Sequence, residues 1–264
     1  MVAPSRPVEA LCLDLMGTIF EPIGGTRKAE FVSSIYLRYL PRQVTIHDVM
    51  TAVKRARKHH VQEDYTSARE RWIQVNLEVL RAFGAHKVTE EVAAQIHDAF
   101  TTRPELYEVR FDTRAFLDFA QSKGIALAII SNQPRAEIMH FLEHHHLMGY
   151  FGKRIVSAED VDSYKPRLRF FTRAVQRLGY QPRAVLHIGN SLQHDAAGSK
   201  VIRTCLLLRE GPRPRKLFRT QLDSGMLAYF DTWERLRFLL ERRRLIVGKE
   251  SAHSLALFLA RASA

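Results

Sequence analysis

A short apolar run near the N-terminus, which ends in an aspartate, constrains the fold of this chain more than any other feature. The run at residues 9–13 is long enough for a buried strand but too short for the core of a helix, and Asp14 follows it directly. Gly17 and Thr18 come next, and a glycine permits a tight turn and the close approach of a ligand to the backbone. Because ligands of open α/β sheets bind at the carboxyl ends of strands, Asp14 is a candidate reactive carboxylate. An aspartate that only caps a turn would give the same local pattern.

Two later apolar runs, at residues 126–130 and 184–188, also have the length of buried strands and also end in polar groups. The polar groups at these two ends and in the loop between the runs are Ser131, Asn132, Lys165, Asn190 and Asp195. Taken alone, Ser131 is explained as a helix cap and Lys165 as a surface lysine before a proline turn. Taken with Asp14, the set supplies a nucleophile, a hydroxyl, an amine and a second carboxylate, mostly at strand ends.

The order and spacing of these groups resemble the four motifs of the haloacid dehalogenase (HAD) superfamily. The first motif of that family is Asp-x-Asp-Gly-x-Thr or a close variant, the second a Ser or Thr after a strand, the third a Lys, and the fourth Gly-Asp-Ser with a later Asp. The matching stretch runs from about residue 9 to about residue 240. The resemblance implies a hydrolase in which Asp14 forms a covalent aspartyl intermediate and so splits one difficult displacement into two easier steps.

The same resemblance implies roles for the other motif residues. Lys165 would keep Asp14 ionised and offset charge in the transition state. Asp195 would orient Lys165 or a water molecule, or stand behind the ligands of a metal ion. Leaving-group or phosphoryl oxygens would be held by Thr18, Ser131 and the backbone N–H of Asn132.

Two positions depart from the motifs of HAD phosphatases. Where those enzymes place a second aspartate as the general acid for the leaving oxygen, this chain has Met16, which transfers no proton. General acid catalysis is worth ~10²–10⁴-fold, so efficient hydrolysis of phosphomonoesters is not expected. Where they have an aspartate that binds Mg²⁺, this chain has Asn190, whose neutral amide weakens a site for a hard cation. Any Mg²⁺ would be held weakly by Asp14, the Met16 carbonyl and Asn190, and the favoured interpretation requires no cofactor.

Both departures favour a dehalogenase-like reaction on a small organic substrate such as a 2-haloacid. Haloacid dehalogenases lack the second aspartate, need no metal and release a halide that requires no proton. Met16 and Asn190 would then contact the substrate, and Arg38 or Arg42 would clamp its carboxylate. The match is incomplete, because the aromatic residue that those dehalogenases place six residues after the lysine is Phe171 here, without a hydroxyl.

Other functions remain open. One is a non-catalytic binding or scaffold protein that kept the fold and gained a basic surface, and another is a weak Mg²⁺-dependent phosphatase. Opening of an epoxide by the same nucleophile is also chemically compatible. The net charge of +12 and the pI near 10 permit attraction to nucleic acid. No aromatic residues interleave with the basic C-terminal segment to form a stacking platform, so specific nucleic-acid binding is not expected.

The alternation of strand-like and helix-like segments predicts an α/β fold with a doubly wound parallel sheet. Residues 1–22 and 104–245 would form this HAD-like core. The segment between them has helical periodicity and a capping box at Thr45 and Asp48, which predicts an inserted all-helical cap over residues 23–103. Residues 246–264 would form a C-terminal extension.

The composition, 46% hydrophobic and 26% charged, is that of a soluble globular protein, and no apolar run approaches the ~20 residues that span a membrane. The absence of a secretory pattern and the presence of only Cys12 and Cys205 favour a cytoplasmic protein. The expected partner is a small-molecule substrate, and a homodimer is compatible with the sequence. Among the histidines, we expect His187 to be a core or second-layer residue and His194 to lie near the reactive edge of the sheet.

Overall fold

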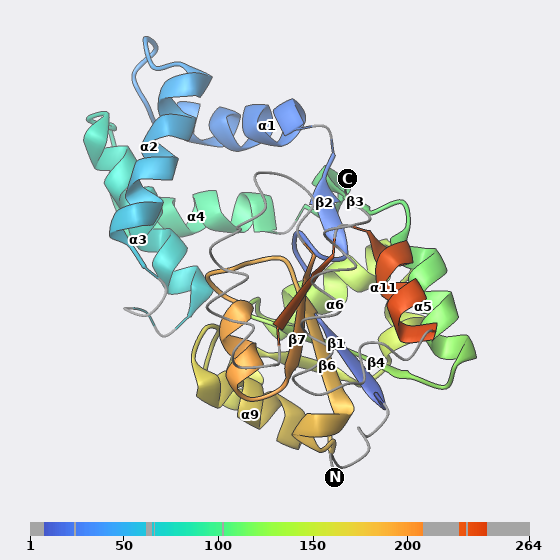
Figure 1. The fold of residues 1–264 in the computed structure, drawn as a ribbon. Helices are drawn as coiled ribbons and strands as arrows, with labels where there is room; N and C mark the ends of the chain where they lie inside the picture. Colours follow the sequence, from blue (N-terminus) through green and yellow to red (C-terminus); the bar gives the residue numbers. More distant parts are fainter. Residues whose placement is uncertain are drawn as a thin grey trace. The chain divides into compact units, whose positions relative to one another are not determined.

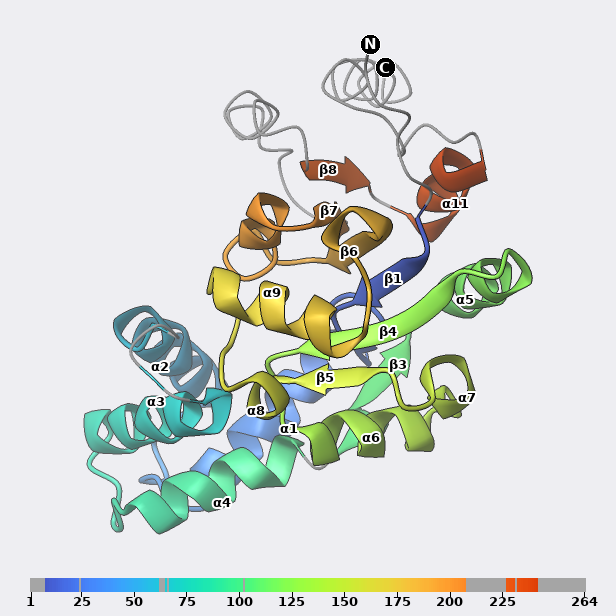
Figure 2. The ribbon, with the colours of Figure 1, turned by 90° about the horizontal axis from the view of Figure 1, so that it is seen from below.

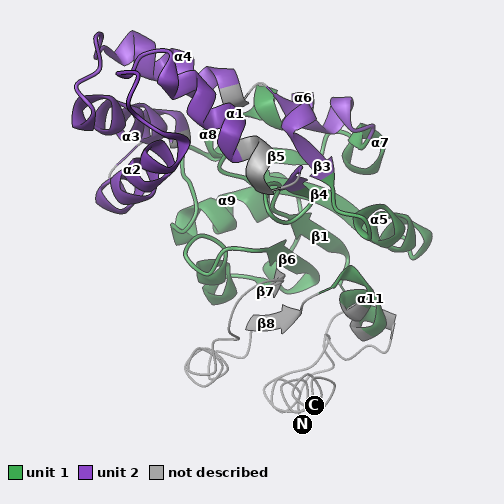
Figure 3. Ribbon diagram, turned by 90° about the horizontal axis from the view of Figure 1, so that it is seen from above, with its two compact units in different colours: residues 1–20, 109–138, 147–264 green, residues 21–108, 139–146 purple. Residues whose placement is uncertain are grey.

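The computed structural model describes residues 8–23, 25–61, 65, 67–101, 103–207, 227–230 and 232–241. The chain divides into two compact units (Figure 3). Unit 1 comprises residues 1–20, 109–138 and 147–264, and unit 2 comprises residues 21–108 and 139–146. The expected cap at 23–103 therefore differs in its bounds from unit 2, which also takes in the end of a later helix. The expected extension at 246–264 lies outside the described residues.

Unit 1 contains a six-stranded sheet in which every neighbouring pair of strands is parallel, as drawn in Figures 1 and 2. The order across the sheet is β5-β4-β1-β6-β7-β8, so the chain starts in the middle and winds outward in both directions. The strands are β1 (Ala10–Leu13), β4 (Ala126–Ser131), β5 (Ile155–Ser157), β6 (Val185–Gly189), β7 (Arg203–Leu207) and β8 (Leu227–Phe230). This arrangement confirms the predicted doubly wound parallel sheet.

Helices cover both faces of this sheet, which is why its central strand β1 is apolar along its whole length. All four residues of β1 are buried. Against one face packs α9, and α5 and α11 pack against each other on the other side, where Phe116 and Trp233 stack with ring centroids 4.5 Å apart (Figure 1). The helices of unit 1 and those that cross its boundary are α5 (Thr113–Ser122), α6 (Arg135–His144), α7 (Met148–Phe151), α8 (Ala158–Val161), α9 (Leu168–Arg177) and α11 (Trp233–Glu241). Short 3-10 turns are η2 (Pro104–Leu106), η3 (Pro182–Ala184) and η4 (Ala196–Lys200).

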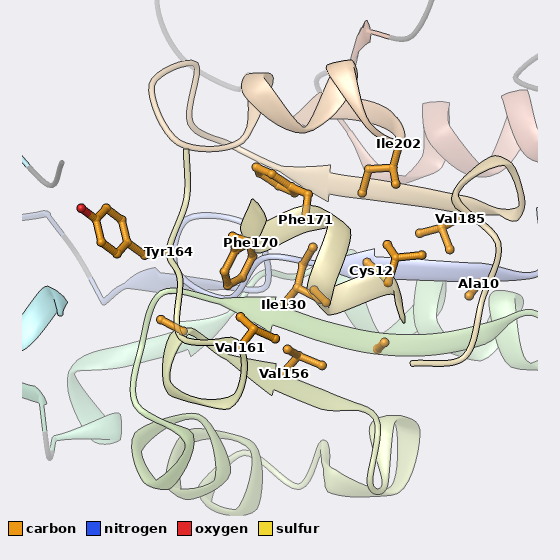
Figure 4. Close-up of a cluster of buried hydrophobic side chains, with 14 residues drawn as sticks. Ala10, Cys12, Ile130, Val156, Val161, Tyr164, Phe170, Phe171, Val185 and Ile202 are labelled. Carbon is orange, nitrogen blue, oxygen red and sulfur yellow. The ribbon is translucent and has the colours of Figure 1, made fainter. Parts of the chain in front are cut away.

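Helix α9 packs against the sheet of unit 1 through a cluster of buried hydrophobic side chains. Phe170 and Phe171 from α9 lie over Cys12 of β1 and Ile130 of β4, and all four side chains are buried (Figure 4). Phe170, Phe171, Ala174 and Val175 recur at helical spacing, which gives α9 one continuous apolar face. This packing fixes the loop before α9, and Lys165 lies in that loop.

A second, smaller sheet is not anticipated by the sequence. The short strand β2 (Phe20–Pro22) pairs with β3 (Tyr107–Val109) in a separate two-stranded sheet. Strands of three residues are too short to show periodicity, so the sequence gives no signal for them.

Unit 2 is built largely from the helices α1 (Gly25–Leu37), α2 (Ile46–His59), α3 (Ala68–Ala82) and α4 (Glu90–Thr101). Thr45 caps α2 with the expected capping box, since Thr45 Oγ1 accepts from the Asp48 N–H and Asp48 Oδ2 accepts from the Thr45 N–H. Their apolar faces meet in one buried cluster that includes Tyr36, Val49 and Val79. No helix within the described ranges has both the length and the apolar character needed to cross a bilayer.

Candidate active site

The carboxyl ends of three strands meet at one edge of the sheet in unit 1. Leu13, the last residue of β1, pairs with Ile129 of β4 on one side and with Ile188 of β6 on the other. Residues that follow these three positions, among them Asp14, therefore lie at the same edge. Because the chain winds away from β1 in both directions, the strand order reverses between β1 and β6, and such a switch point is where doubly wound sheets bind ligands.

Lys165 joins two carboxylates at this edge. Its ammonium nitrogen Nζ lies 2.8 Å from Asp14 Oδ1 and 2.8 Å from Asp195 Oδ1. The side chains of Lys165 and Asp195 are almost completely buried, whereas that of Asp14 is 16% exposed. The structure thus places three residues that were singled out in the sequence within one ion-paired cluster, with Asp14 as its accessible end.

Asp195 receives hydrogen bonds on both of its oxygens. Oδ1 accepts from Lys165 and lies 3.0 Å from Nε2 of His187. Oδ2 accepts from the backbone N–H groups of Asn190 and Ser191, at 3.2 and 3.0 Å. Gly189 leaves the space for this, because a Cβ there would come within 2.2 Å of the Asp195 carboxyl carbon. Asp195 is therefore a buried anion that is held in place behind Lys165, rather than a group that reaches a substrate.

The surroundings drive the pKa values of the two carboxyls in opposite directions. Burial raises the pKa of Asp14 above its ordinary value, the ammonium of Lys165 opposes that rise, and the charge of Asp195 adds to it. Burial also acts to raise the pKa of Asp195, but Lys165 and His187 outweigh it, and the pKa lies well below its usual range. The pKa of Lys165 is raised, since the two carboxylates outweigh the effect of its burial. As pH falls, Asp14 is the carboxyl that takes up a proton first.

A tight turn after Asp14 brings the first and fourth motifs together. The Gly17 N–H donates to the Phe20 carbonyl, at 2.7 Å, and Gly17 has a φ of +79°, which glycine adopts without strain. The side chain of Asn190 lies directly against Gly17, so that a Cβ there would come within 2.1 Å of Asn190 Nδ2. The hydroxyl of Thr18, which is fully buried, donates to Asn190 Oδ1 at 3.4 Å. The glycine therefore serves both the turn and the approach of the fourth motif.

We expect Gly17→Ala to destabilise the protein and to lower its turnover. A positive φ costs an alanine ~1–2 kcal/mol, and the new methyl group would also displace Asn190. Gly179→Ala is the matched control, because Gly179 has a φ of +77° but no atom within 4 Å of an added Cβ. Urea unfolding of both variants measures the difference. Equal losses of unfolding free energy would contradict the contact with Asn190.

Asn132 holds the backbone of Lys165 with its side chain. Asn132 Nδ2 donates to the Lys165 carbonyl at 3.0 Å, and Asn132 Oδ1 accepts from the Lys165 N–H at 2.7 Å. The motif pattern points only to the backbone N–H of Asn132, so this contact is not anticipated by the sequence. The preceding hydroxyl, Ser131 Oγ, is buried at the end of β4 and accepts from the Gln133 N–H at 3.4 Å.

The possible magnesium ligands provide a single carboxylate. Asp14 Oδ1 already bears the Lys165 ammonium, Met16 offers only a carbonyl, and Asn190 is a neutral amide whose oxygen accepts from Thr18. Within the described ranges, no three His, Cys, Asp or Glu side chains are grouped so as to share a metal ion. Because Mg²⁺ is held chiefly by carboxylate charge, this set does not fit a tightly bound ion, and we assign no catalytic step to one.

Arg38 and Arg42, the candidates for a carboxylate clamp, are exposed residues of unit 2 between α1 and α2. Their role remains a prediction. His187, expected to be a core or second-layer residue, is buried and lies with Nε2 3.0 Å from Asp195 Oδ1. His194 has its N–H bonded to Ser191 Oγ at 3.1 Å, beside the fourth motif.

The model of the haloacid dehalogenase-like hydrolases matches residues 8–202, which is most of the chain. The chain belongs to this family. This HAD-like hydrolase is 26% identical over 177 residues to the mouse haloacid dehalogenase-like hydrolase domain-containing protein 3, a match that covers 65% of this chain and 69% of the mouse protein.

Solved structures share the fold with this HAD-like hydrolase. The 2-haloacid dehalogenase from Pseudomonas syringae pv. Tomato DC3000 superimposes with a TM-score of 0.59 at 16% identity and covers 89% of this chain and 99% of its own. A HAD phosphatase from Thermococcus onnurineus superimposes with a TM-score of 0.60 at 20% identity, covering 88% of this chain and 98% of its own. The fold is therefore compatible with both chemistries, and the choice between them depends on the site.

Proposed function

We propose that this HAD-like hydrolase uses Asp14 as a nucleophile on a small organic substrate whose leaving group departs without a proton, with a carbon–halogen bond as the favoured target. The observation that carries the proposal is the asymmetry of the Asp14 carboxylate. Oδ1 is held by Lys165 at 2.8 Å, while Oδ2 has no hydrogen-bond donor among the described residues. The hydrogen bond to Oδ1 fixes the direction of the carboxylate, and Oδ2 is left without a donor, which suits Oδ2 to act as the nucleophile.

The reaction would proceed in two steps. Asp14 Oδ2 attacks the carbon that bears the halogen, the new C–O bond forms, and the halide leaves with the bonding electron pair. Water then adds to the carbonyl carbon of the aspartyl ester, one of its protons leaves with the alcohol and the other is released to solvent, and the carboxylate is restored. Lys165 holds Asp14 ionised at the start, and buried Thr18 and Ser131 line the edge of the sheet where the substrate is expected.

Charge and proton supply argue against efficient phosphatase chemistry. A phosphomonoester brings two negative charges to Asp14, and Lys165, the cation that contacts Asp14 in the described structure, is shared with a second carboxylate. Met16 occupies the position from which the leaving oxygen would receive a proton. A halide needs neither a second cation nor a proton. Arg38 and Arg42 stay the candidates that would bind a substrate carboxylate.

Turnover on a defined panel tests this proposal. Wild type and Asp14→Asn are compared on a 2-haloacid, an epoxide and a phosphomonoester, each with Mg²⁺ and with EDTA. We expect halide release that persists in EDTA and disappears in Asp14→Asn. In ¹⁸O-enriched water, hydrolysis at the ester carbonyl would place label in the Asp14 peptide, whereas hydrolysis at phosphorus would not. Mg²⁺-dependent phosphate release without labelled Asp14 would overturn the proposal. If wild type turns over no substrate of the panel, the result would favour a non-catalytic protein with a basic surface.

A weak Mg²⁺-dependent phosphatase is the second candidate, and one observation favours it. The side-chain oxygens of Thr18 and Asn190 lie 3.4 Å apart, next to the turn that follows Asp14. Oxygen ligands grouped near one carboxylate are a partial magnesium site that lacks mainly charge.

We therefore expect Asn190→Asp to confer magnesium binding. The substitution would put a second carboxylate against the Gly17 turn, where the Asn190 side chain now lies, and ligand charge governs affinity for hard cations. Isothermal titration calorimetry with MgCl₂ should give binding at least about tenfold tighter than in wild type. Asn190→Ala is the matched control and should bind no better than wild type. Equal magnesium binding by wild type and Asn190→Asp would show that wild type already has a working metal site.

A further inference from the structure

His187 is a buried histidine of unit 1 that has no role in the two-step reaction proposed for Asp14. It lies in the middle of β6, and its side chain is fully buried. Its ring reaches from β6 to two neighbours. Nδ1 lies 2.8 Å from the carbonyl oxygen of Cys12 on β1, and Nε2 lies 3.0 Å from Asp195 Oδ1.

The partners of the two ring nitrogens determine how many protons the ring carries. A backbone carbonyl can only accept a hydrogen bond, so Nδ1 must carry a proton. Asp195 is surrounded by donors, with Lys165 on Oδ1 and two backbone N–H groups on Oδ2, so it is ionised and can also only accept. Nε2 must therefore carry a proton as well, and a ring with two protons is a cation.

We infer that His187 is a doubly protonated positioning residue, which neutralises Asp195 from below so that Lys165 remains available to Asp14. Two carboxylates and two cations then balance across the cluster. Without the charge on His187, both carboxylates would depend on the one ammonium of Lys165, which would be drawn toward the more deeply buried Asp195. The consequence for Asp14 rests on its proposed function as the nucleophile.

Of the charged groups near the His187 ring, Asp195 and Asp14 favour a positive charge on it, and the ammonium of Lys165 opposes it. The acidic and basic groups around it are Asp195, Lys165, Cys12 and Asp14. Burial raises the pKa of the Cys12 thiol to about 12, so Cys12 adds no charge. On the side of α9, the ring of Phe171 lies with its centroid 5.4 Å from that of His187. Asp195 is thus the anion that contacts the ring in the described structure.

Nitrogen-15 NMR of the full chain, labelled at histidine, tests the charge without any substrate. The His187 signals are those lost in His187→Gln, and at pH 7 we expect the shifts of an imidazolium with protons on both nitrogens. In Asp195→Asn, which also identifies the signals if His187→Gln does not fold, the ring should revert to the singly protonated form. A neutral His187 ring in wild type at pH 7 would overturn the inference.

Turnover tests the positioning role. We expect His187→Gln to lower kcat about 10- to 100-fold with KM changed less than about twofold, because the substrate does not touch this residue. Thr204→Val is the matched control: Thr204 is a buried neighbour of His187 across the sheet, and this change should leave kcat within about twofold. Equal losses in the two variants, or wild-type kcat in His187→Gln, would overturn the role. If wild type turns over no substrate of the panel, that result counts against the proposed function alone, because the NMR measurement does not depend on turnover.

Discussion

Replacing Lys165 by methionine is expected to abolish turnover and to lower the free energy of unfolding by roughly 3–5 kcal/mol at pH 7. The substitution keeps the length and the apolar stem of the side chain but removes the ammonium. That ammonium lies 2.8 Å from each of two carboxylates, and its own side chain is only 2% exposed. Two anions would then be left with the His187 cation alone, in a site where water cannot replace the lost ammonium, and the larger part of the cost is their mutual repulsion and their burial in a low dielectric.

Urea unfolding and the substrate panel measure this prediction. Lys153→Met is the matched control, because Lys153 is an exposed lysine of the same unit, and a surface change of this kind stays within about 0.5 kcal/mol. The deficit of Lys165→Met should shrink in acid, where protonation of Asp14 removes the uncompensated charge. A Lys165→Met protein as stable as the control would mean that the ammonium does not hold the two carboxylates together.

The position of the site at the sheet edge could be predicted from the sequence, and the reason is geometric. Apolar runs that end in Asp14, Ser131 and Asn190 must deliver those side chains to one edge once the strands are parallel, and the observed register does so. Lys165 comes from a loop, whose course no periodicity describes. Lys165 could be identified as a site residue only from its position between the second and fourth motifs along the chain. Its contact with both carboxylates could not be predicted from the spacing of the motifs.

The residues that the sequence did not reveal act through contacts between distant segments. His187 stands inside an apolar strand, and a pattern of buried residues cannot distinguish a histidine that fills space from one that binds an aspartate across a turn. The side chain of Asn132 looks like part of a strand end, yet its partner is the backbone of Lys165, 33 residues away. The β2–β3 pair was missed for a related reason, since each strand has three residues and is defined only by its partner.

Asp195→Asn is expected to cost roughly 3–5 kcal/mol of unfolding free energy at pH 7 and to reduce turnover severely. Four donors converge on this carboxylate, two on each oxygen. An asparagine has one oxygen and one NH₂ group in the same space. Whichever way the amide turns, either Lys165 and His187 or the two backbone N–H groups would face another donor. The substitution therefore removes a charge and also places donors against donors in a buried site.

The pH dependence of this loss separates charge from packing. Lys165 and His187 outweigh burial and hold the pKa of Asp195 below that of an unfolded aspartate, which is about 3.9. The stabilisation that comes from the ionised form is thus complete above that pH and is lost as the pH falls through the lower pKa of the folded state. The difference in unfolding free energy between wild type and Asp195→Asn, measured in urea from pH 7 downward, should hold steady to about pH 4 and then shrink. Asp162→Asn makes the same chemical change at a side chain that is 95% exposed, with a φ of 45° that asparagine tolerates, and should change stability little at any pH. A deficit of Asp195→Asn that stays constant into strong acid would assign its cost to shape and hydrogen bonding, and Asp195 would then not be the fixed anion on which the assignment of charge to His187 depends.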